Sequence, residues 1–180
     1  MPTVLFTGGT RSGKSALAQS FAERHAPPLL FIATAQVLDE EMIARIARHQ
    51  ADRGSAWKSL ESPLDLPVVF ESALAGAGYG AVLIDCVTLW LSNLMGAGHG
   101  VAAILEEVHR LAGVLGSASV PTAVVTNEVG SGIVPAYVSG REFRDLAGEA
   151  NQVLARACSH VVLAVCGLPL PVKPLGGPLP

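Results

Sequence analysis

Cysteine is scarce in this chain. The three that are present, Cys86, Cys158 and Cys166, show no C-x-x-C spacing. An odd number without paired spacing argues against a disulfide framework or a zinc site, and it favours a reducing cytoplasm as the location. The N-terminus also lacks a basic segment and meets Gly8 and Gly9 almost at once, so we expect no secretory signal peptide.

Charge is scarce as well, and long apolar runs are missing. Charged residues make up 15% of the chain and the net charge is −3, which argues against a broad nucleic-acid surface but leaves room for a local anion site. Apolar runs such as Ala81–Ile84 and Val161–Cys166 have the length of strands and are too short to cross a membrane. We therefore expect neither nucleic-acid binding nor membrane insertion.

Hydrophobic residues, by contrast, are abundant. They make up 50% of the 180 residues, and the mean hydropathy is +0.45. A chain of this length supports one compact domain, and so apolar a composition favours a parallel sheet with helices on both faces. We expect a single domain over residues 1–170 and an irregular tail rich in proline and glycine over residues 171–180.

Strand-like and helix-like segments alternate along the chain, as in βαβ units. The expected strands are Thr3–Thr7, Leu29–Ala33, Ala81–Asp85, Thr122–Thr126 and His160–Val165. The expected helices are Lys14–His25, Val37–Asp52, Leu64–Ala75, Val101–Leu115 and Arg141–Cys158. The pattern predicts an α/β fold.

The segment "TGGTRSGKSALA" carries the strongest motif. Gly8, Gly13, Lys14 and Ser15 fit G-x-x-x-x-G-K-[ST] between an apolar strand and a helical pattern. Backbone N–H groups of such a loop and the positive end of the following helix surround nucleotide phosphates. Lys14 is expected to reach the β- and γ-phosphates and Ser15 to bind Mg²⁺, as in P-loop NTPases.

Two further strand ends carry polar residues toward the same edge of the sheet. Asp85 follows four apolar residues and suits a Walker B carboxylate on Mg²⁺; the alternative is an aspartate that caps a helix starting near Thr88. Asn127 and Glu128 end another strand. Glu128 is either a base for a substrate hydroxyl or a loop carboxylate paired with an arginine.

The segment "RIARHQADRG" places His49 among arginines near the end of an expected helix. A neutral imidazole can attack phosphorus while guanidinium groups hold the phosphate oxygens, and nearby cations lower the pKa of a histidine. The alternative is a helix-end histidine that interacts with the last carbonyl groups. For a lone histidine, the residues by themselves favour that alternative.

Several motifs together resemble one family over nearly the whole chain. They are "FTGGTRSGKS", "FIATAQVLDEEMIARIARHQADRG", "WKSLE", "LIDCVTLWLSNLM", "VVTNEVGSGIVP" and "REFRDLAGEANQVLA". In this order they resemble the bifunctional adenosylcobinamide kinase/adenosylcobinamide-phosphate guanylyltransferases of cobalamin biosynthesis.

The resemblance implies two reactions. A nucleoside triphosphate, ATP or GTP, first phosphorylates the aminopropanol hydroxyl of adenosylcobinamide. His49 then attacks the α-phosphorus of GTP, releases pyrophosphate and passes GMP to the adenosylcobinamide phosphate, giving adenosylcobinamide-GDP. Lys14 and His49 are the catalytic residues that this reading implies, and Ser15 and Asp85 the ligands of Mg²⁺.

The resemblance also implies a RecA-like sheet, a homotrimer and a set of nucleotide contacts. In chain order these contacts are Gly8, Gly9, Thr10, Arg11, Ser12, Gly13, Lys14, Ser15, Ala33, Thr34, Ala35, Gln50, Ala51, Asp52, Arg53, Glu61 and Asp85. Glu61 suits guanine, because a carboxylate accepts hydrogen bonds from the N1–H and N2–H groups of guanine, and adenine has no donor at either position. Two other readings remain: a plain small-molecule kinase without a covalent intermediate, and a P-loop switch driven by hydrolysis.

Overall fold

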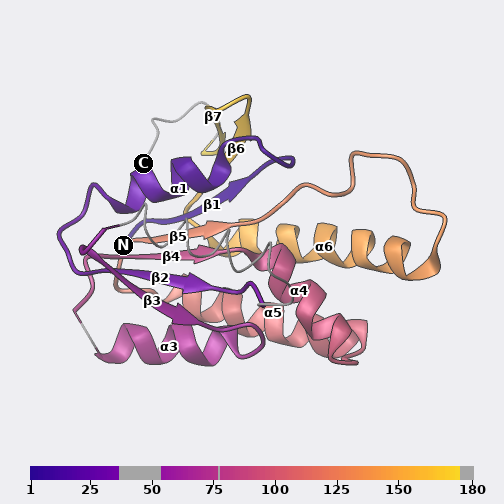
Figure 1. The fold of residues 1–180 in the computed structure, drawn as a ribbon, viewed down its shortest axis with the longest axis horizontal. Coiled ribbons are helices and arrows are strands. Elements are labelled where there is room, and N and C mark those ends of the chain that lie inside the picture. The colour runs from indigo at the N-terminus through magenta and orange to yellow at the C-terminus, as the bar shows by residue number, and fades with distance from the viewer. Residues whose placement is uncertain (37–53, 77, 175–180) are drawn as a thin grey trace.

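One sheet of seven strands forms the centre of the molecule (Figure 1), in the order β3-β2-β4-β5-β1-β6-β7. The computed structural model describes residues 1–36, 54–76 and 78–174. All strand pairs are parallel except the antiparallel pair β6–β7. The strands are β1 (Thr3–Thr7), β2 (Leu29–Ala33), β3 (Trp57–Glu61), β4 (Ala81–Asp85), β5 (Thr122–Val125), β6 (His160–Val165) and β7 (Leu168–Lys173).

Helices cover both faces of this sheet. Helix α1 packs on β1, β4, β5 and β6 from one face, while the other described helices pack against one another on the opposite face (Figure 1). The described helices are α1 (Lys14–Ala22), α3 (Leu66–Gly76), α4 (Val87–Gly96), α5 (Val101–Gly116) and α6 (Val138–Ala157). None of the helices in this part of the chain is long and apolar enough to cross a membrane.

The central strands are buried on both faces. In β1, Leu5 packs into the core under α5 and α6, and its neighbour Phe6 packs into the core under α1. Successive side chains of a strand point to opposite faces, so a strand covered on both sides needs an apolar residue at every position. The continuous apolar runs of the sequence are therefore explained, and the predicted α/β class is confirmed.

Two strands were not expected from the sequence, and both lie at the edges of the sheet. Strand β3 exposes Lys58, Ser59, Leu60 and Glu61, so its sequence lacks the apolar continuity of a central strand. Strand β7 has the sequence LPLPVK, and proline is tolerated in an edge strand because one side of that strand needs no ladder hydrogen bonds. Strand β7 also crosses the expected boundary at 170/171 and extends to Lys173.

Other differences are shifts at element ends. The helix expected near Thr88 is α4, which begins at Val87, and α6 begins at Val138 rather than Arg141. Helix α1 ends at Ala22 rather than at His25. The helix expected over residues 37–52 and the last six tail residues lie outside the described part of the chain.

Candidate active site

The phosphate loop lies where the motif predicts it, between β1 and α1. Lys14 is the first residue of α1, and its Nζ donates a hydrogen bond to the Gly9 carbonyl at 3.0 Å. Gly13 forms the N-cap with φ of 93° and provides no side-chain cap. The first N–H groups of α1 therefore have no side-chain acceptor from the cap, which is the arrangement that binds anions at a helix N-terminus.

Elements distant in sequence hold this loop from two sides. The N–H of Gly167, in the β6–β7 turn, donates to the Ser12 carbonyl at 2.8 Å, and the N–H of Glu128 donates to the Gly8 carbonyl at 3.0 Å. A Cβ at Gly13 would lie 2.9 Å from the Gly167 Cα, and one at Gly8 would lie 2.6 Å from a β6 carbonyl. Both glycines of the motif are thus required by close backbone packing as well as by their positive φ angles.

One polar atom inside the loop is unsatisfied. Ser12 is 9% exposed, and its Oγ has no hydrogen-bond partner in the described residues. Buried hydroxyl groups almost always have a partner. A phosphate oxygen in the loop would be a suitable one, so the chemistry of the loop fits the nucleotide that the motif predicts.

The ends of three neighbouring strands bring other predicted residues together. Ala33 pairs in register with Glu61 on one side and with Asp85 on the other. The backbone beyond Ala33 is fixed by Thr34, whose Oγ1 accepts from the Cys86 N–H at 2.8 Å and donates to the Cys86 carbonyl at 2.7 Å. The predicted contacts Ala33, Thr34, Glu61 and Asp85 therefore share one edge of the sheet.

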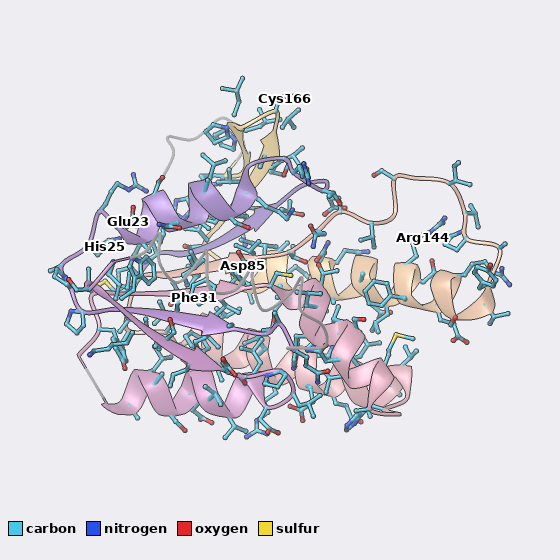
Figure 2. The ribbon with its side chains drawn as sticks, viewed as in Figure 1. Glu23, His25, Phe31, Asp85, Arg144 and Cys166 are labelled. Carbon is cyan, nitrogen blue, oxygen red and sulfur yellow. The ribbon has the colours of Figure 1, made fainter. Side chains whose placement is uncertain are left out.

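Asp85 lies at the end of β4, near the middle of the molecule (Figure 2). The N-cap of α4 is Cys86, which forms no side-chain cap, so Asp85 does not occupy the capping position considered as its alternative role. Burial, and to a smaller extent the Asp85 carboxylate, raise the pKa of the Cys86 thiol to about 11, while the Lys14 ammonium opposes the shift. Asp85, at the end of β4, and Lys14, at the start of α1, thus both act on the buried Cys86 thiol.

The donor set fits a magnesium ion that depends on a nucleotide. In the described residues no group of three or more histidine, cysteine, aspartate or glutamate side chains could hold a metal ion. Magnesium in P-loop proteins needs no such cage, because a hydroxyl, one carboxylate and the phosphates suffice. Ser15, in the first turn of α1, and Asp85, at the end of β4, are the side chains that would hold it.

A polar cluster beside the loop was only partly anticipated. Thr7 Oγ1 donates to Glu128 Oε1 at 2.8 Å, and Asn151 Nδ2 donates to the same oxygen at 3.1 Å. Glu128 therefore binds a hydroxyl and an amide, not the arginine considered for it, among the described residues. Thr7 gave no signal in the sequence because a threonine ending a strand is ordinary. Asn151 is the last residue of the "REFRDLAGEAN" segment, which could have drawn attention to it.

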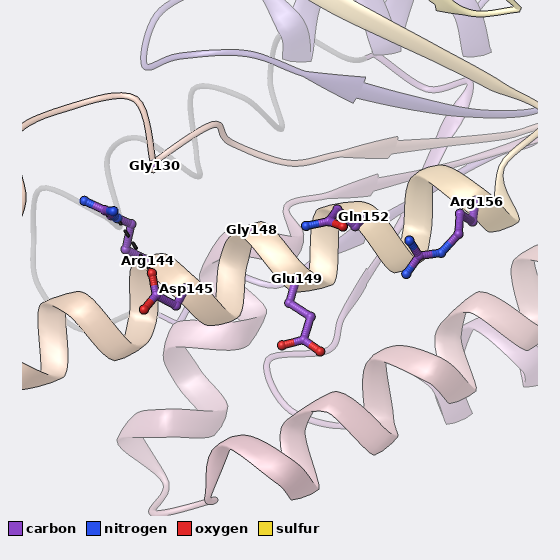
Figure 3. Close-up of a pocket in the computed structure, with 7 residues that line it drawn as sticks. All are labelled: Gly130, Arg144, Asp145, Gly148, Glu149, Gln152 and Arg156. Atoms are coloured by element: carbon purple, nitrogen blue, oxygen red, sulfur yellow. Dashed lines mark ion pairs between the residues drawn. The ribbon is translucent and has the colours of Figure 1, made fainter.

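A shallow groove runs along α6 from the loop after β5 (Figure 3). Its volume is about 510 Å³. Arg144 and Asp145 lie at one end of the groove, and Arg144 Nε is 3.8 Å from Asp145 Oδ1. Figure 2 shows Arg144 well away from Asp85 at the end of β4. The lining residues are Gly130, Arg144, Asp145, Gly148, Glu149, Gln152 and Arg156.

Part of the predicted site falls outside the described residues. These are His49, Gln50, Ala51, Asp52 and Arg53, for which the expectations stay predictions. The described part thus brings together the phosphate loop and the ends of β2, β3 and β4. It also adds Thr7 and Asn151, which were not predicted, as hydrogen-bond partners of the candidate residue Glu128.

Comparison with known proteins gives the family. Residues 4–172 match the family described as cobinamide kinase / cobinamide phosphate guanyltransferase. The bifunctional adenosylcobalamin biosynthesis protein CobP of Pseudomonas aeruginosa is 40% identical and aligns with 97% of this chain and 98% of its own length. CobU proteins of the same description from Salmonella typhimurium and Escherichia coli are 38% and 36% identical, each over 94% of this chain and 99% of the relative.

A solved structure supports the fold independently. The RadB recombinase superposes with a TM-score of 0.52 at 15% identity, over 90% of this chain and 73% of that one, which shows a RecA-like P-loop fold. The match in sequence spans both the phosphate loop and the Glu128–Asn151 cluster. This chain therefore belongs to the cobinamide kinase / cobinamide phosphate guanylyltransferase family.

Proposed function

We propose that this protein phosphorylates the aminopropanol hydroxyl of adenosylcobinamide and then transfers GMP from GTP to the new phosphate. The products are adenosylcobinamide-GDP and pyrophosphate. The observation that carries the proposal is a preformed phosphate loop, with Ala33, Glu61 and Asp85 at the same sheet edge, in a chain of this family.

In the kinase step, the chain's own groups bind and orient the triphosphate. Lys14, the loop N–H groups and the N-terminus of α1 hold its oxygens, with ATP or GTP as the phosphoryl donor. Mg²⁺ held by Ser15 and Asp85 would neutralise charge on the β- and γ-phosphates. The orphan hydroxyl of Ser12 gains a phosphate partner when the nucleotide binds.

In the transfer step, His49 attacks the α-phosphorus of GTP and a phosphoramidate to GMP forms as pyrophosphate leaves. The phosphate of adenosylcobinamide phosphate then attacks the same phosphorus, and the histidine leaves. Two displacements replace one direct meeting of two anions. Contacts from Gln50, Ala51, Asp52 and Arg53 to the nucleotide and from Glu61 to guanine complete the proposed site.

We further propose a homotrimer in the cytoplasm. The segment before and at the start of α6 supports a subunit contact, because its apolar side chains are left in water: Ile133 is 97% exposed and Tyr137 is 79% exposed. Exposed apolar groups gathered in one segment are typical of interfaces. The three cysteines without paired spacing favour the cytoplasm.

The covalent intermediate gives the test. The protein is incubated with Mg²⁺ and GTP labelled at the α-phosphate, denatured, and analysed for label that is stable to base and lost in acid, as a phosphoramidate is. We expect label in the wild type and in His109→Ala, a control on α5, and none in His49→Ala. Nucleotide binding without label in the wild type would contradict the transfer step and favour the plain kinase.

A further inference from the structure

Glu128 occupies a position that the proposed phosphate chemistry does not yet use. We propose that Glu128 is the general base of the phosphoryl-transfer step, and that Asn151 is a positioning residue that orients its carboxylate. The inference rests on the function proposed above and names the group that activates the acceptor hydroxyl.

The first argument is position. Glu128 follows β5, which is the sheet neighbour of β1, and its N–H donates to the carbonyl of Gly8, the first residue of the phosphate loop. Its side chain bonds to Thr7, the last residue before that loop, at 2.8 Å. Backbone and side chain are thus both tied to the end of β1, where the motif places the phosphates.

The second argument is the state of the carboxylate. Oε1 accepts both hydrogen bonds, from Thr7 and Asn151, and both donors are neutral. Within the described residues Oε2 has no hydrogen-bond donor, and no lysine or arginine forms an ion pair with Glu128. Two donors thus fix Oε1, whereas Oε2 has no donor in this part of the chain, and Glu128 as a whole residue is exposed.

The third argument is a chain of hydrogen bonds that sets the direction of the Asn151 amide. The Asn127 N–H donates to Thr88 Oγ1 at 2.8 Å, so the Thr88 hydroxyl is free to donate to Thr126 Oγ1 at 3.4 Å. Thr126 Oγ1 in turn donates to Asn151 Oδ1 at 2.7 Å. With Oδ1 used as the acceptor, Nδ2 points to the Asn127 carbonyl and to the Glu128 carboxylate.

The hydrogen bonds from Thr88 through Thr126 and Asn151 therefore orient the Glu128 carboxylate as well as support the loop. Thr126 is 1% exposed and Thr88 is 8% exposed, so the chain begins at buried, fixed groups and ends at an exposed carboxylate. A rigid supporting set of hydrogen bonds around a reactive group is what orientation of a catalytic base requires. The two segments "TNEVG" and "REFRDLAGEAN" meet at this carboxylate.

The step balances as a proton transfer coupled to a displacement. Glu128 Oε2 takes the proton of the substrate hydroxyl as that oxygen forms its bond to the γ-phosphorus. The bond from the γ-phosphorus to the β–γ bridging oxygen breaks, and the nucleoside diphosphate leaves with that electron pair. Glu128 gives its proton to water after the product leaves.

The second reaction of the protein needs no such base, because its acceptor is an ionised phosphate. The two half-reactions therefore separate the proposed role from a structural one. The kinase step is measured with adenosylcobinamide and GTP labelled at the γ-phosphate. The transfer step is measured with adenosylcobinamide phosphate and GTP labelled at the α-phosphate.

We expect Glu128→Gln, which keeps the shape and a hydrogen-bond acceptor, to lower the kinase kcat by about 10²- to 10⁴-fold with little change in the KM for GTP. The transfer rate should stay within a few-fold of wild type. Formate added to Glu128→Ala should restore part of the kinase rate, which it would not do if the side chain only supported the loop. Glu106→Gln, an exposed carboxylate on α5, is the matched control and should leave both rates unchanged.

Asn151→Ala tests the positioning role. It should lower the kinase kcat by a smaller factor, about 10-fold, and leave the transfer rate unchanged, because one imperfectly oriented carboxylate still accepts protons. Its KM for GTP should also stay near wild type.

Three results would overturn the inference: a Glu128→Gln kinase within a few-fold of wild type, an equal loss of both half-reactions, or no rescue of Glu128→Ala by formate. If the proposed function itself were wrong, the wild type would leave adenosylcobinamide unphosphorylated. That result differs from all three, because in each of them the wild type is an active kinase.

Discussion

A lysine in the edge strand β7 closes the C-terminus of α6, and its removal tests the packing of the tail. Lys173 Nζ donates to the carbonyls of Ala155 at 3.0 Å, Arg156 at 3.0 Å and Cys158 at 2.6 Å. The last four carbonyls of a helix have no partner within the helix, and a cation there also interacts favourably with the helix dipole. We therefore predict that Lys173→Met destabilises the protein.

The magnitude follows from the exposure of each bond. The bond to Arg156 is exposed and water replaces it, so it is omitted. The bonds to Ala155 and Cys158 are partly buried, and at the lower limit for charged groups, about 1.5 kcal/mol each, they contribute about 3 kcal/mol. Restored side-chain freedom returns about 1 kcal/mol, since ordering a lysine costs up to about 2. The expected net loss is about 2 kcal/mol.

For a domain of this size, that loss corresponds to a fall in Tm of about 4–8 °C. Thermal unfolding followed by circular dichroism measures it, at one protein concentration because assembly alters apparent stability. Lys58→Met, an exposed lysine on β3, is the control and should change Tm little. A Tm for Lys173→Met equal to that of Lys58→Met would refute the reasoning.

Two further predictions concern cysteine reactivity and the phosphate loop. Burial raises the pKa of Cys86 to about 11 and that of Cys158 to about 12, so both stay protonated at pH 8, and native protein should take up iodoacetamide at the exposed Cys166 alone. Mass spectrometry checks this, and native labelling of either buried cysteine would contradict it. Gly13→Ala places a Cβ 2.9 Å from the β6–β7 turn at a φ of 93°, and should weaken GTP binding at least about 10-fold by calorimetry. Gly113→Ala on α5 meets no atom and is its control; equal affinities would refute the packing argument.

The sequence predicted best the strands that are buried on both faces. The observed bounds of β1, β2, β4 and β6 equal the predicted ones. Strands β1, β2 and β4 are buried almost throughout, because a strand covered by helices on both sides must be apolar at nearly every position. The edge strands β3 and β7 lack that requirement. Strand β7 alternates leucine with proline, and its position is decided by pairing with β6 and by contacts of Lys173 with α6, neither of which is a local property.

The candidate site divides in a similar way. The phosphate loop was predictable because glycine, lysine and serine at fixed spacing act together within eight residues. The Glu128 cluster was not, because Thr7 and Glu128 are 121 positions apart in the chain. Glu128 could be named as a candidate from its place at a strand end. Its two proposed roles, a base for a substrate hydroxyl or a partner of an arginine, could not be separated without knowing which groups surround it. That choice depends on where α6 places Asn151.

The order of strands explains how one nucleotide cradle can serve two acceptors in the proposed reactions. Glu128 follows β5, beside the phosphate loop of β1, whereas Glu61 ends β3 at the far edge of the sheet. Strands β5 and β3 are three strand spacings of about 4.8 Å apart, or about 14 Å. A carboxylate that accepts a proton from a hydroxyl and a carboxylate that reads guanine therefore do not compete for one position. The first reaction needs a base at the phosphate end because its acceptor is a hydroxyl. The second reaction must select guanine over adenine, because its product carries guanosine, and Glu61 at the edge strand β3 is the residue proposed for that selection.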